Sequence, residues 1–245
     1  MSSSGALELG TMRNLEMVPL LVLSFFLAAT GLSTSSNGGK RMTYNYFAFG
    51  SNMLTQTMTD LRNLSPLAST AAVLPSHELR FNVPGTPLIE PSWASVEPRT
   101  DSVVHGVLYS LSEEDFAAMC ASEGVPFAYT LHRCRPVPYK GDGTDAGQRA
   151  LTSGNGVGAD PSPPRGVPAF TLRASNRRWR ESPAVEDPSP SQSYLNVLIR
   201  GAKEFGLDGD YLKMLETKEA GRALFGGTAE RMLDVAVARG RTGGR

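Results

Sequence analysis

Apolar residues form their longest uninterrupted run close to the N-terminus. Residues 17–32, MVPLLVLSFFLAATGL, carry no charge and are almost wholly apolar. The run is shorter than the ~20 residues that a membrane-spanning helix needs, and its length suits the apolar core of a signal peptide better. Three interpretations stay open: a cleaved targeting leader, a membrane anchor and a spurious extension of the gene. Residues 33–41, STSSNGGKR, form a polar linker, so we assign 1–41 to a hydrophobic leader and linker.

From Thr43 onwards, short apolar stretches alternate with polar residues and turn signals. Residues 44–49, YNYFAF, are rich in aromatic side chains and end at Gly50, which predicts a strand followed by a turn. Residues 53–61 then predict a helix. The same patterns predict further strands at 71–83, 93–97, 103–111, 128–139 and 167–172.

Capping signals predict where the helices begin and end. Ser112 precedes three acidic residues, so we expect it to be the N-cap of a helix that runs to Ser122 and ends at Glu123-Gly124. Residues 189–192, SPSQ, place a cap at Ser189, a proline after it and a glutamine in the first turn, which predicts a helix up to Gly206. Two further helices are expected at 209–218 and 229–239. Strands with few helices and short connections indicate an α+β fold.

Two segments do not follow these patterns. Residues 139–166 contain seven glycines and three prolines in 28 positions, so we interpret them as a low-complexity insertion that is disordered or loosely held. Residues 218–245 form a basic tail rich in glycine and arginine. The globular domain therefore spans 42–217, and roughly 150 of its residues are left to build one core.

Composition narrows the class of function. Lysine plus arginine and aspartate plus glutamate both number 24, and this zero net charge argues against a general nucleic-acid binder. The chain has only two cysteines and three widely spaced histidines, which disfavours a disulfide framework and a metal site. We therefore expect neither a metal nor a cofactor, and any catalysis should use carboxylates, hydroxyls and backbone groups. The sequence predicts no oligomeric state.

Two features could carry chemistry. Gly50 allows the backbone to come close to a neighbour, and the N–H groups of Ser51, Asn52 and Met53 would then form an anion-binding nest at a helix start. Glu123, at the end of its helix, is a candidate general base. An ordinary capped turn and an exposed surface glutamate are the plain alternatives.

Other residues are weaker candidates. Glu90 and Glu97 could line a pocket, although glutamates flanked by proline usually lie in exposed loops. The basic, aromatic segment around Trp179 could bind an anion but is more typical of a solvated loop; its arginines are Arg173, Arg177, Arg178 and Arg180. We expect Arg62 to fix the turn at 63–66. His105 and Cys120 are expected to be packed side chains.

Four segments in register resemble the γ-glutamylcyclotransferase family. Residues 47–53, FAFGSNM, resemble its Tyr-Gly-Ser-Asn-(Leu/Met) signature, with Phe49 in place of the tyrosine. Residues 104–109, VHGVLY, look like the strand ahead of the family's catalytic segment, and residues 121–124, ASEG, match the segment with its catalytic glutamate. Residues 188–191 and 201–207 resemble its C-terminal helix. The resemblance covers residues 43–217 apart from the insertion.

The resemblance implies a fold and an activity. The sheet would be mixed, mainly antiparallel and curled into a small β-barrel with flanking helices. The substrate would be a γ-glutamyl compound whose own α-amine attacks its γ-carbonyl, releasing 5-oxoproline. Glu123 would be the general acid and base, and the substrate would be bound by Phe49, Gly50, Ser51, Asn52 and Met53. The implied partner is a small molecule, with membrane contact only through residues 17–32 if they are retained.

The sequence departs from the family pattern at two places, and it leaves the substrate open. Phe49 lacks the hydroxyl of the signature tyrosine, and residues 170–180 lack a tyrosine that the family often has there. The acceptable substrates include γ-glutamyl amino acids, glutathione and γ-glutamylamines, which share the same γ-glutamyl half. A non-catalytic ligand-binding protein of the same fold is the alternative from another class. The catalytic domain is of a cytoplasmic type, behind an N-terminal leader if that interpretation holds.

Overall fold

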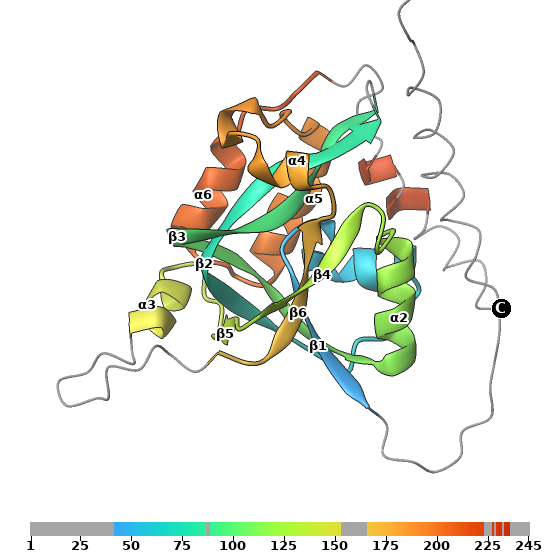
Figure 1. Cartoon of the computed structure of the whole chain (residues 1–245). Helices are drawn as coiled ribbons and strands as arrows, with labels where there is room; N and C mark the ends of the chain where they lie inside the picture. The colour runs from blue at the N-terminus through green and yellow to red at the C-terminus, as the bar shows by residue number, and fades with distance from the viewer. Residues whose placement is uncertain are drawn as a thin grey trace, which may run out of the picture. The chain divides into compact units, whose positions relative to one another are not determined.

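The computed structural model describes residues 42–86, 89–152 and 166–222, together with residues 227, 229–231 and 233–235. The apolar run at 17–32 and residues 153–165 lie outside this part of the chain. Within it, no helix is long and apolar enough to cross a membrane. The elements form a mixed sheet with helices on both sides, so the expected α+β fold is confirmed (Figure 1).

A long hairpin of two strands dominates the sheet. β2 (Ala68–Thr86) and β3 (Glu90–Ser112) replace the three shorter strands that the apolar pattern predicted. They remain paired because irregularities absorb the breaks: the register shifts between Pro75 and His77 and again between Arg80 and Val83. Ser76 and Asp101 adopt positive φ angles of 57° and 62°, which bends the hairpin without ending it.

The remaining strands flank this hairpin. The strand order is β4-β6-β1-β3-β2-β5. β1 (Thr43–Ala48) pairs antiparallel with β3 and parallel with β6 (Ala169–Ala174). β4 (Tyr129–Cys134) and the two-residue β5 (Val137–Pro138) form the edges.

The expected closure into a barrel is wrong. β4 and β5 are separated by only two residues, Arg135 and Pro136, yet no ladder joins them among the described strands. Proline has no backbone N–H to donate to a ladder. The prolines at 136 and 138 therefore leave this seam open, and the sheet stays curled but unclosed.

Two predicted helices start at serine caps. α2 (Glu113–Ser122) has the expected cap, since Ser112 Oγ accepts a hydrogen bond from the Asp115 N–H at 3.0 Å. α5 (Gln192–Glu204) begins two residues later than predicted, because Ser191 rather than Ser189 accepts the N–H of Tyr194 at 3.0 Å.

The other predicted helices agree with the structure to different degrees. α6 (Gly209–Thr217) lies where the pattern predicted it, and residues 229–231 and 233–235 are helical. The single helix expected at 53–61 is instead two short turns, η1 (Ser51–Met53) and η2 (Thr57–Leu61), because Leu54 adopts an extended conformation between them.

Three short elements were not predicted. They are α3 (Ala146–Thr152), α4 (Arg177–Glu181) and η4 (Ala184–Glu186). α3 lies within the glycine-rich segment, and its first turn is anchored by Asp208, whose carboxylate accepts the N–H groups of Gly147 and Gln148 at 2.7 and 2.8 Å. A helix held by a distant carboxylate leaves little periodic signal in its own sequence.

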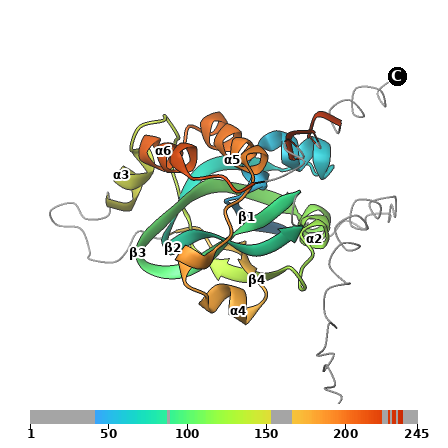
Figure 2. The same ribbon diagram turned by 90° about the horizontal axis from the view of Figure 1, so that it is seen from above.

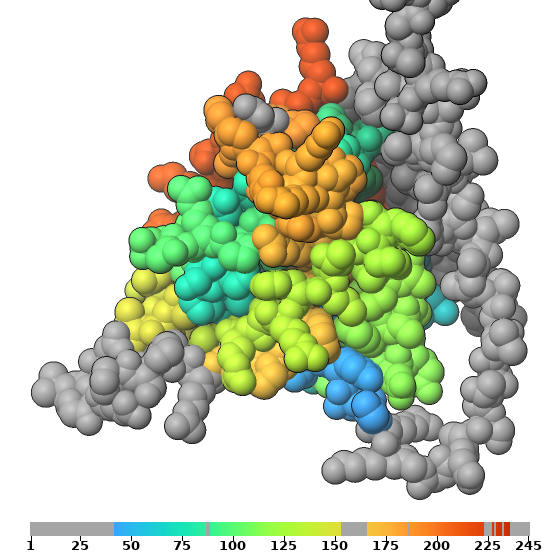
Figure 3. All heavy atoms as spheres, in the orientation of Figure 1, coloured from blue at the N-terminus to red at the C-terminus, as the bar shows by residue number. Residues whose placement is uncertain are grey.

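The helices lie on different sides of the sheet. Viewed from above, α3, α5 and α6 lie on one side of the β2–β3 hairpin, α4 lies on the other, and α2 lies beside β1 (Figure 2). The space-filling view, in the orientation of Figure 1, shows that side chains fill the spaces between the ribbons drawn there (Figure 3). The core is continuous from β1 to α5 and includes Phe47, Met53 and Leu198, each fully buried.

Candidate active site

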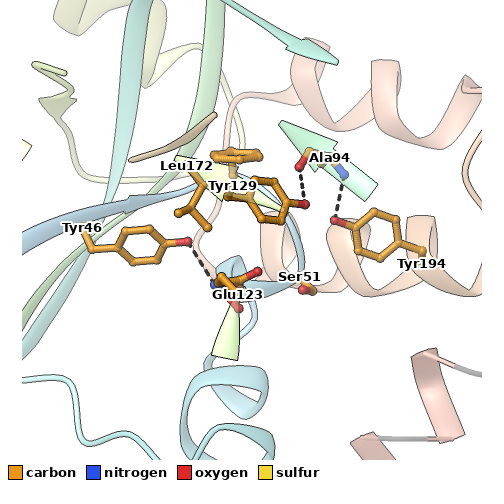
Figure 4. A pocket seen from close by; sticks show the side chains of 10 residues that line it. Tyr46, Ser51, Ala94, Glu123, Tyr129, Leu172 and Tyr194 are labelled. Carbon is orange, nitrogen blue, oxygen red and sulfur yellow. Dashed lines mark hydrogen bonds between the residues drawn. The ribbon is translucent and has the colours of Figure 1, made fainter. Parts of the chain in front are cut away.

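A small pocket lies where β1 ends and the chain turns into η1. It encloses about 20 Å³ and collects side chains from β1, β3, α2, β4, β6 and α5 (Figure 4). Its lining consists of Tyr46, Phe49, Gly50, Ser51, Asn52, Ala94, Glu123, Tyr129, Leu172 and Tyr194. Segments more than 140 residues apart in the sequence thus meet around one carboxylate.

Glu123 owes its position to the end of α2. It is the C-cap residue of that helix, and its N–H donates to the carbonyl of Met119 at 3.0 Å. Gly124 follows with φ = +70°, a conformation that glycine adopts without the steric cost of a Cβ atom and that commonly ends helices. The turn directs the Glu123 side chain into the pocket, where it is 14% exposed.

Two side chains hold the Glu123 carboxylate. Arg62 Nη2 lies 2.5 Å from Glu123 Oε1, and Asn52 Nδ2 donates to the same oxygen at 2.7 Å. Arg62 also donates from Nε to Asn52 Oδ1 at 2.7 Å. The three side chains therefore form a closed ring of charge-assisted hydrogen bonds, which are stronger than bonds between neutral groups.

Both the oxygen and the nitrogen of the Asn52 side-chain amide are hydrogen-bonded. Its oxygen accepts from Arg62, and its nitrogen donates both to Glu123 and to the hydroxyl of Tyr46, the latter at 3.0 Å. Because Arg62 has only donors and the carboxylate only acceptors, these partners fix which end of the amide is oxygen. Asn52 thereby couples the strand that carries Tyr46 to the helix end that carries Glu123.

Three tyrosine hydroxyls surround the carboxylate. Tyr46 accepts from Asn52, Tyr129 donates to the carbonyl of Ala94 at 2.9 Å, and Tyr194 accepts the N–H of Ala94 at 3.3 Å. Burial is the main cause that raises the pKa of each phenol, and the charge of Glu123 adds to it. The tyrosines therefore remain protonated near neutral pH and can supply hydrogen bonds but not negative charge.

Gly50 allows the turn to pack closely against Tyr194. A Cβ atom on Gly50 would lie 2.9 Å from the Tyr194 hydroxyl. Of the five residues predicted to bind substrate, Phe49, Gly50, Ser51 and Asn52 line the pocket. Met53 lies outside the lining: its side chain is fully buried, and its N–H donates to the carbonyl of Gly50.

The weaker candidates lie away from the pocket. Glu90 binds the N-cap residue of α5, because its carboxylate accepts hydrogen bonds from the backbone N–H and the hydroxyl of Ser191. Glu97 pairs with Arg173 at 2.5 Å. Arg177 pairs with Glu181, and Arg180 donates to backbone carbonyls of residues 174 and 175. Among the described residues, no three side chains of the metal-ligating types gather into a potential metal site.

Three of the residues around Glu123 were not identified from the sequence. Arg62, expected to fix a turn, reaches the carboxylate from 61 residues away. Tyr129 and Tyr194 meet at the backbone of Ala94, from opposite sides. Tyr46, in contrast, lay within the segment already singled out, four residues before Gly50.

Comparisons with known proteins show which family the chain resembles. The profile of the AIG2-like family matches residues 103–215. A γ-glutamyl cyclotransferase, gliK, from Claviceps purpurea is 28% identical over 169 residues, or 66% of this chain and 64% of the relative. Another, aclK from Aspergillus oryzae, is 26% identical over 188 residues, or 71% of this chain and 60% of the relative. The chain thus spans less than two thirds of these relatives' length.

Solved structures show the same fold. A structure named γ-glutamyl cyclotransferase superimposes with a TM-score of 0.57 at 20% identity and covers 80% of this chain and 99% of its own. An uncharacterized human protein gives a TM-score of 0.58 at 20% identity and covers 80% of this chain and 98% of its own. The chain therefore has the γ-glutamylcyclotransferase-like fold and resembles that family in sequence.

Proposed function

We propose that the protein is a γ-glutamylcyclotransferase that converts a γ-glutamyl compound to 5-oxoproline and a free amine. The observation that carries this proposal is Glu123, a single carboxylate that enters a pocket otherwise lined by neutral side chains and backbone. A carboxylate there can pair with the α-ammonium group of the substrate and accept the proton that the amine must lose. The fold, the family resemblance and the names of the relatives support the same conclusion.

The reaction requires few groups because it is intramolecular. The α-amine of the substrate attacks its own γ-carbonyl carbon, so one C–N bond forms and closes a five-membered ring. The amide C–N bond to the leaving amine then breaks. Holding the γ-glutamyl chain folded, with the amine against the carbonyl, supplies much of the acceleration.

Glu123 moves the proton between the two nitrogens. Its carboxylate accepts the proton that the attacking amine must lose, and the resulting carboxylic acid donates that proton to the leaving nitrogen. The carboxylate is regenerated at the end of each turnover. Hydrogen bonds from the hydroxyls of Tyr46 and Tyr194, which act as acceptors toward Asn52 and Ala94, and from the backbone at residues 50–52 would stabilise the oxyanion that develops on the γ-carbonyl.

The pocket must widen to admit the substrate. A volume of about 20 Å³ holds about one water molecule, which is less than a γ-glutamyl group occupies. We infer that substrate binding moves the lining side chains apart.

The test is 5-oxoproline formation by the full chain with γ-glutamyl-alanine, glutathione and γ-glutamyl-ε-lysine in parallel. We expect turnover of at least one substrate, and a loss of about 100-fold or more in kcat for Glu123→Gln, as removal of a general base typically causes. Glu114→Gln, on the exposed side of the same helix, is the matched control and should behave like wild type. Equal rates for wild type and Glu123→Gln on every substrate would contradict the mechanism.

A further inference from the structure

We propose that Arg62 is a positioning residue that, with Asn52, holds one oxygen of the Glu123 carboxylate and leaves the other, Oε2, to carry the proton. This inference rests on the proposed function and specifies which atom performs the transfer. It also gives a role to an arginine that the sequence placed in an ordinary turn.

The two carboxylate oxygens of Glu123 have different surroundings. Oε1 accepts from Arg62 at 2.5 Å and from Asn52 at 2.7 Å, which uses both of its lone pairs. Within the described part of the chain, Oε2 accepts no hydrogen bond. A proton that arrives at Oε1 would have to displace one of two charge-assisted bonds, whereas Oε2 can accept it directly.

Arg62 is itself held in place by hydrogen bonds to two further side chains. Its Nε donates to Asn52 Oδ1 at 2.7 Å and its Nη1 to Ser122 Oγ at 2.6 Å. Ser122 in turn donates to the carbonyl of Met119 at 2.9 Å. The planar guanidinium therefore bonds three partners at once, from the pocket turn and from the last turn of α2, and this fixes the direction of the Glu123 side chain.

The groups that face Glu123 leave Arg62 as its charged partner. Tyr46 on β1, Tyr129 on β4 and Tyr194 on α5 are protonated phenols. On α2, burial and the nearby carboxylate raise the pKa of the Cys120 thiol to about 11, so it too is neutral. Among the described residues, Arg62 is the only cation in contact with the Glu123 carboxylate.

Lysine could not replace this arginine. An ammonium group is a compact donor, and it cannot reach Glu123, Asn52 and Ser122 in one plane as a guanidinium does. The proposal therefore predicts that a lysine at 62 retains charge but loses the fixed geometry. A free guanidinium ion, in contrast, could enter the space left by Arg62→Ala.

The experiment compares full-length wild type, Arg62→Ala and Arg62→Lys on the γ-glutamyl compound that wild type turns over. We expect Arg62→Ala to lower kcat about 100-fold with little change in KM, since small misplacements of a catalytic group cost about this much. Guanidinium ion at a non-denaturing concentration should restore part of kcat in Arg62→Ala and have no effect on wild type. Arg200→Ala, which removes an exposed arginine bonded to Gln56, is the control and should keep wild-type kcat.

A readout that does not need turnover separates this inference from the proposed function. The carboxyl ¹³C signal of Glu123, identified by its absence in Glu123→Gln, should change its chemical shift in Arg62→Ala and return toward its wild-type position when guanidinium ion is added. If Arg62→Ala keeps kcat and the signal does not move, Arg62 is only a structural brace and the inference is wrong. If wild type turns over no γ-glutamyl compound, the proposed function is wrong, and the ¹³C shift alone decides the role of Arg62.

Discussion

The hydroxyl of Tyr194 lies 2.9 Å from the place that a Cβ atom on Gly50 would occupy. This contact joins the turn after β1 to the first turn of α5 across the pocket. Real Cβ contacts of that length are not tolerated, so a side chain at position 50 must push the tyrosine away. Tyr194 also accepts the N–H of Ala94, and it could not move without losing that bond.

We therefore expect Gly50→Ala to lower kcat/KM at least about 10-fold, because overpacking a close contact costs about 1–3 kcal/mol. The 5-oxoproline assay measures the loss. A second variant isolates the cause: Gly50→Ala combined with Tyr194→Phe removes the oxygen that the new methyl group meets. If the double variant is as impaired as the sum of the two single changes, steric conflict at this contact is not the reason.

Removal of the Tyr46 hydroxyl should destabilise the protein as well as the site. Tyr46→Phe leaves a buried N–H of Asn52 without its acceptor, and an unsatisfied buried donor costs about 1–3 kcal/mol. We expect the free energy of unfolding in urea to fall by that amount. Tyr44→Phe is the matched control, since Tyr44 stacks on Phe116 through its ring at 4.7 Å and should lose little; equal losses in both variants would argue against the role of Asn52.

Local signals predicted the parts of the fold that depend on neighbours in sequence. The aromatic stretch before Gly50, the Ser112 cap and the Gly206 stop after α5 each act within one turn or one strand, and all three are present. Glu123 at the end of α2 followed from the same reasoning, with Gly124 as the stop. These features are readable because a cap or a periodic face is formed by residues a few positions apart.

The rest of the site depends on contacts that no local pattern encodes. The Arg62–Glu123 pair spans 61 residues, and the bond from Ala94 to Tyr194 spans 100. β3 was divided into two short strands, 93–97 and 103–111, because proline usually ends a strand, whereas the irregularity between Pro75 and His77 on β2, opposite Val103 and Pro98, carries the ladder past this break. Which polar side chains meet in the pocket is decided by this tertiary arrangement.

The buried ion pair between Arg80 and Asp187 should contribute far more to stability than an exposed ion pair nearby. Arg80, only 6% exposed, donates from Nε to Asp187 Oδ2 at 2.5 Å and from Nη2 to Asp187 Oδ1 at 2.6 Å. Arg80→Met leaves a carboxylate that is 11% exposed without its partner, and loss of one member of a buried pair costs about 3–5 kcal/mol.

Urea unfolding of Arg80→Met, Asp187→Leu and the double variant measures this pair. We expect the double variant to be more stable than the sum of the single losses predicts, since neither charge is then left alone. Arg99→Met breaks an exposed pair with Glu78, in which Arg99 is 57% exposed, and it should change stability by less than about 1 kcal/mol. Strict additivity at positions 80 and 187 would show that the two charges do not stabilise each other.

His105 should make stability depend on pH below neutrality. Burial lowers its pKa, although the nearby Asp208 carboxylate, 3.9 Å from Nε2, opposes the effect. Its Nδ1 lies 3.0 Å from the hydroxyl of Tyr139, and the ring of Tyr211 packs 4.9 Å away. The folded protein thus holds a neutral imidazole where the unfolded chain binds a proton near pH 6.5.

The direction of this pH effect follows from the number of protons that the folded and unfolded states bind. Below about pH 6.5 the unfolded state binds more protons at this residue than the folded state does, so acidification favours unfolding until the folded pKa is reached. One such group changes the free energy of unfolding by at most about 1.4 kcal/mol per pH unit. His132, whose pKa burial also lowers, acts in the same direction, whereas Glu90, whose pKa burial raises, acts in the opposite one.

The comparison of wild type with His105→Gln at pH 7.5, 6.5 and 5.5 separates these contributions. Glutamine retains a polar contact for Tyr139 but does not titrate, so the loss of stability on acidification should be smaller in the variant than in wild type. The stability of wild type relative to the variant should fall between pH 7.5 and 5.5, because that is the range in which the unfolded histidine gains its proton. A constant difference across the three pH values would mean that His105 titrates alike in both states, and the buried imidazole would then not be the source of the acid sensitivity.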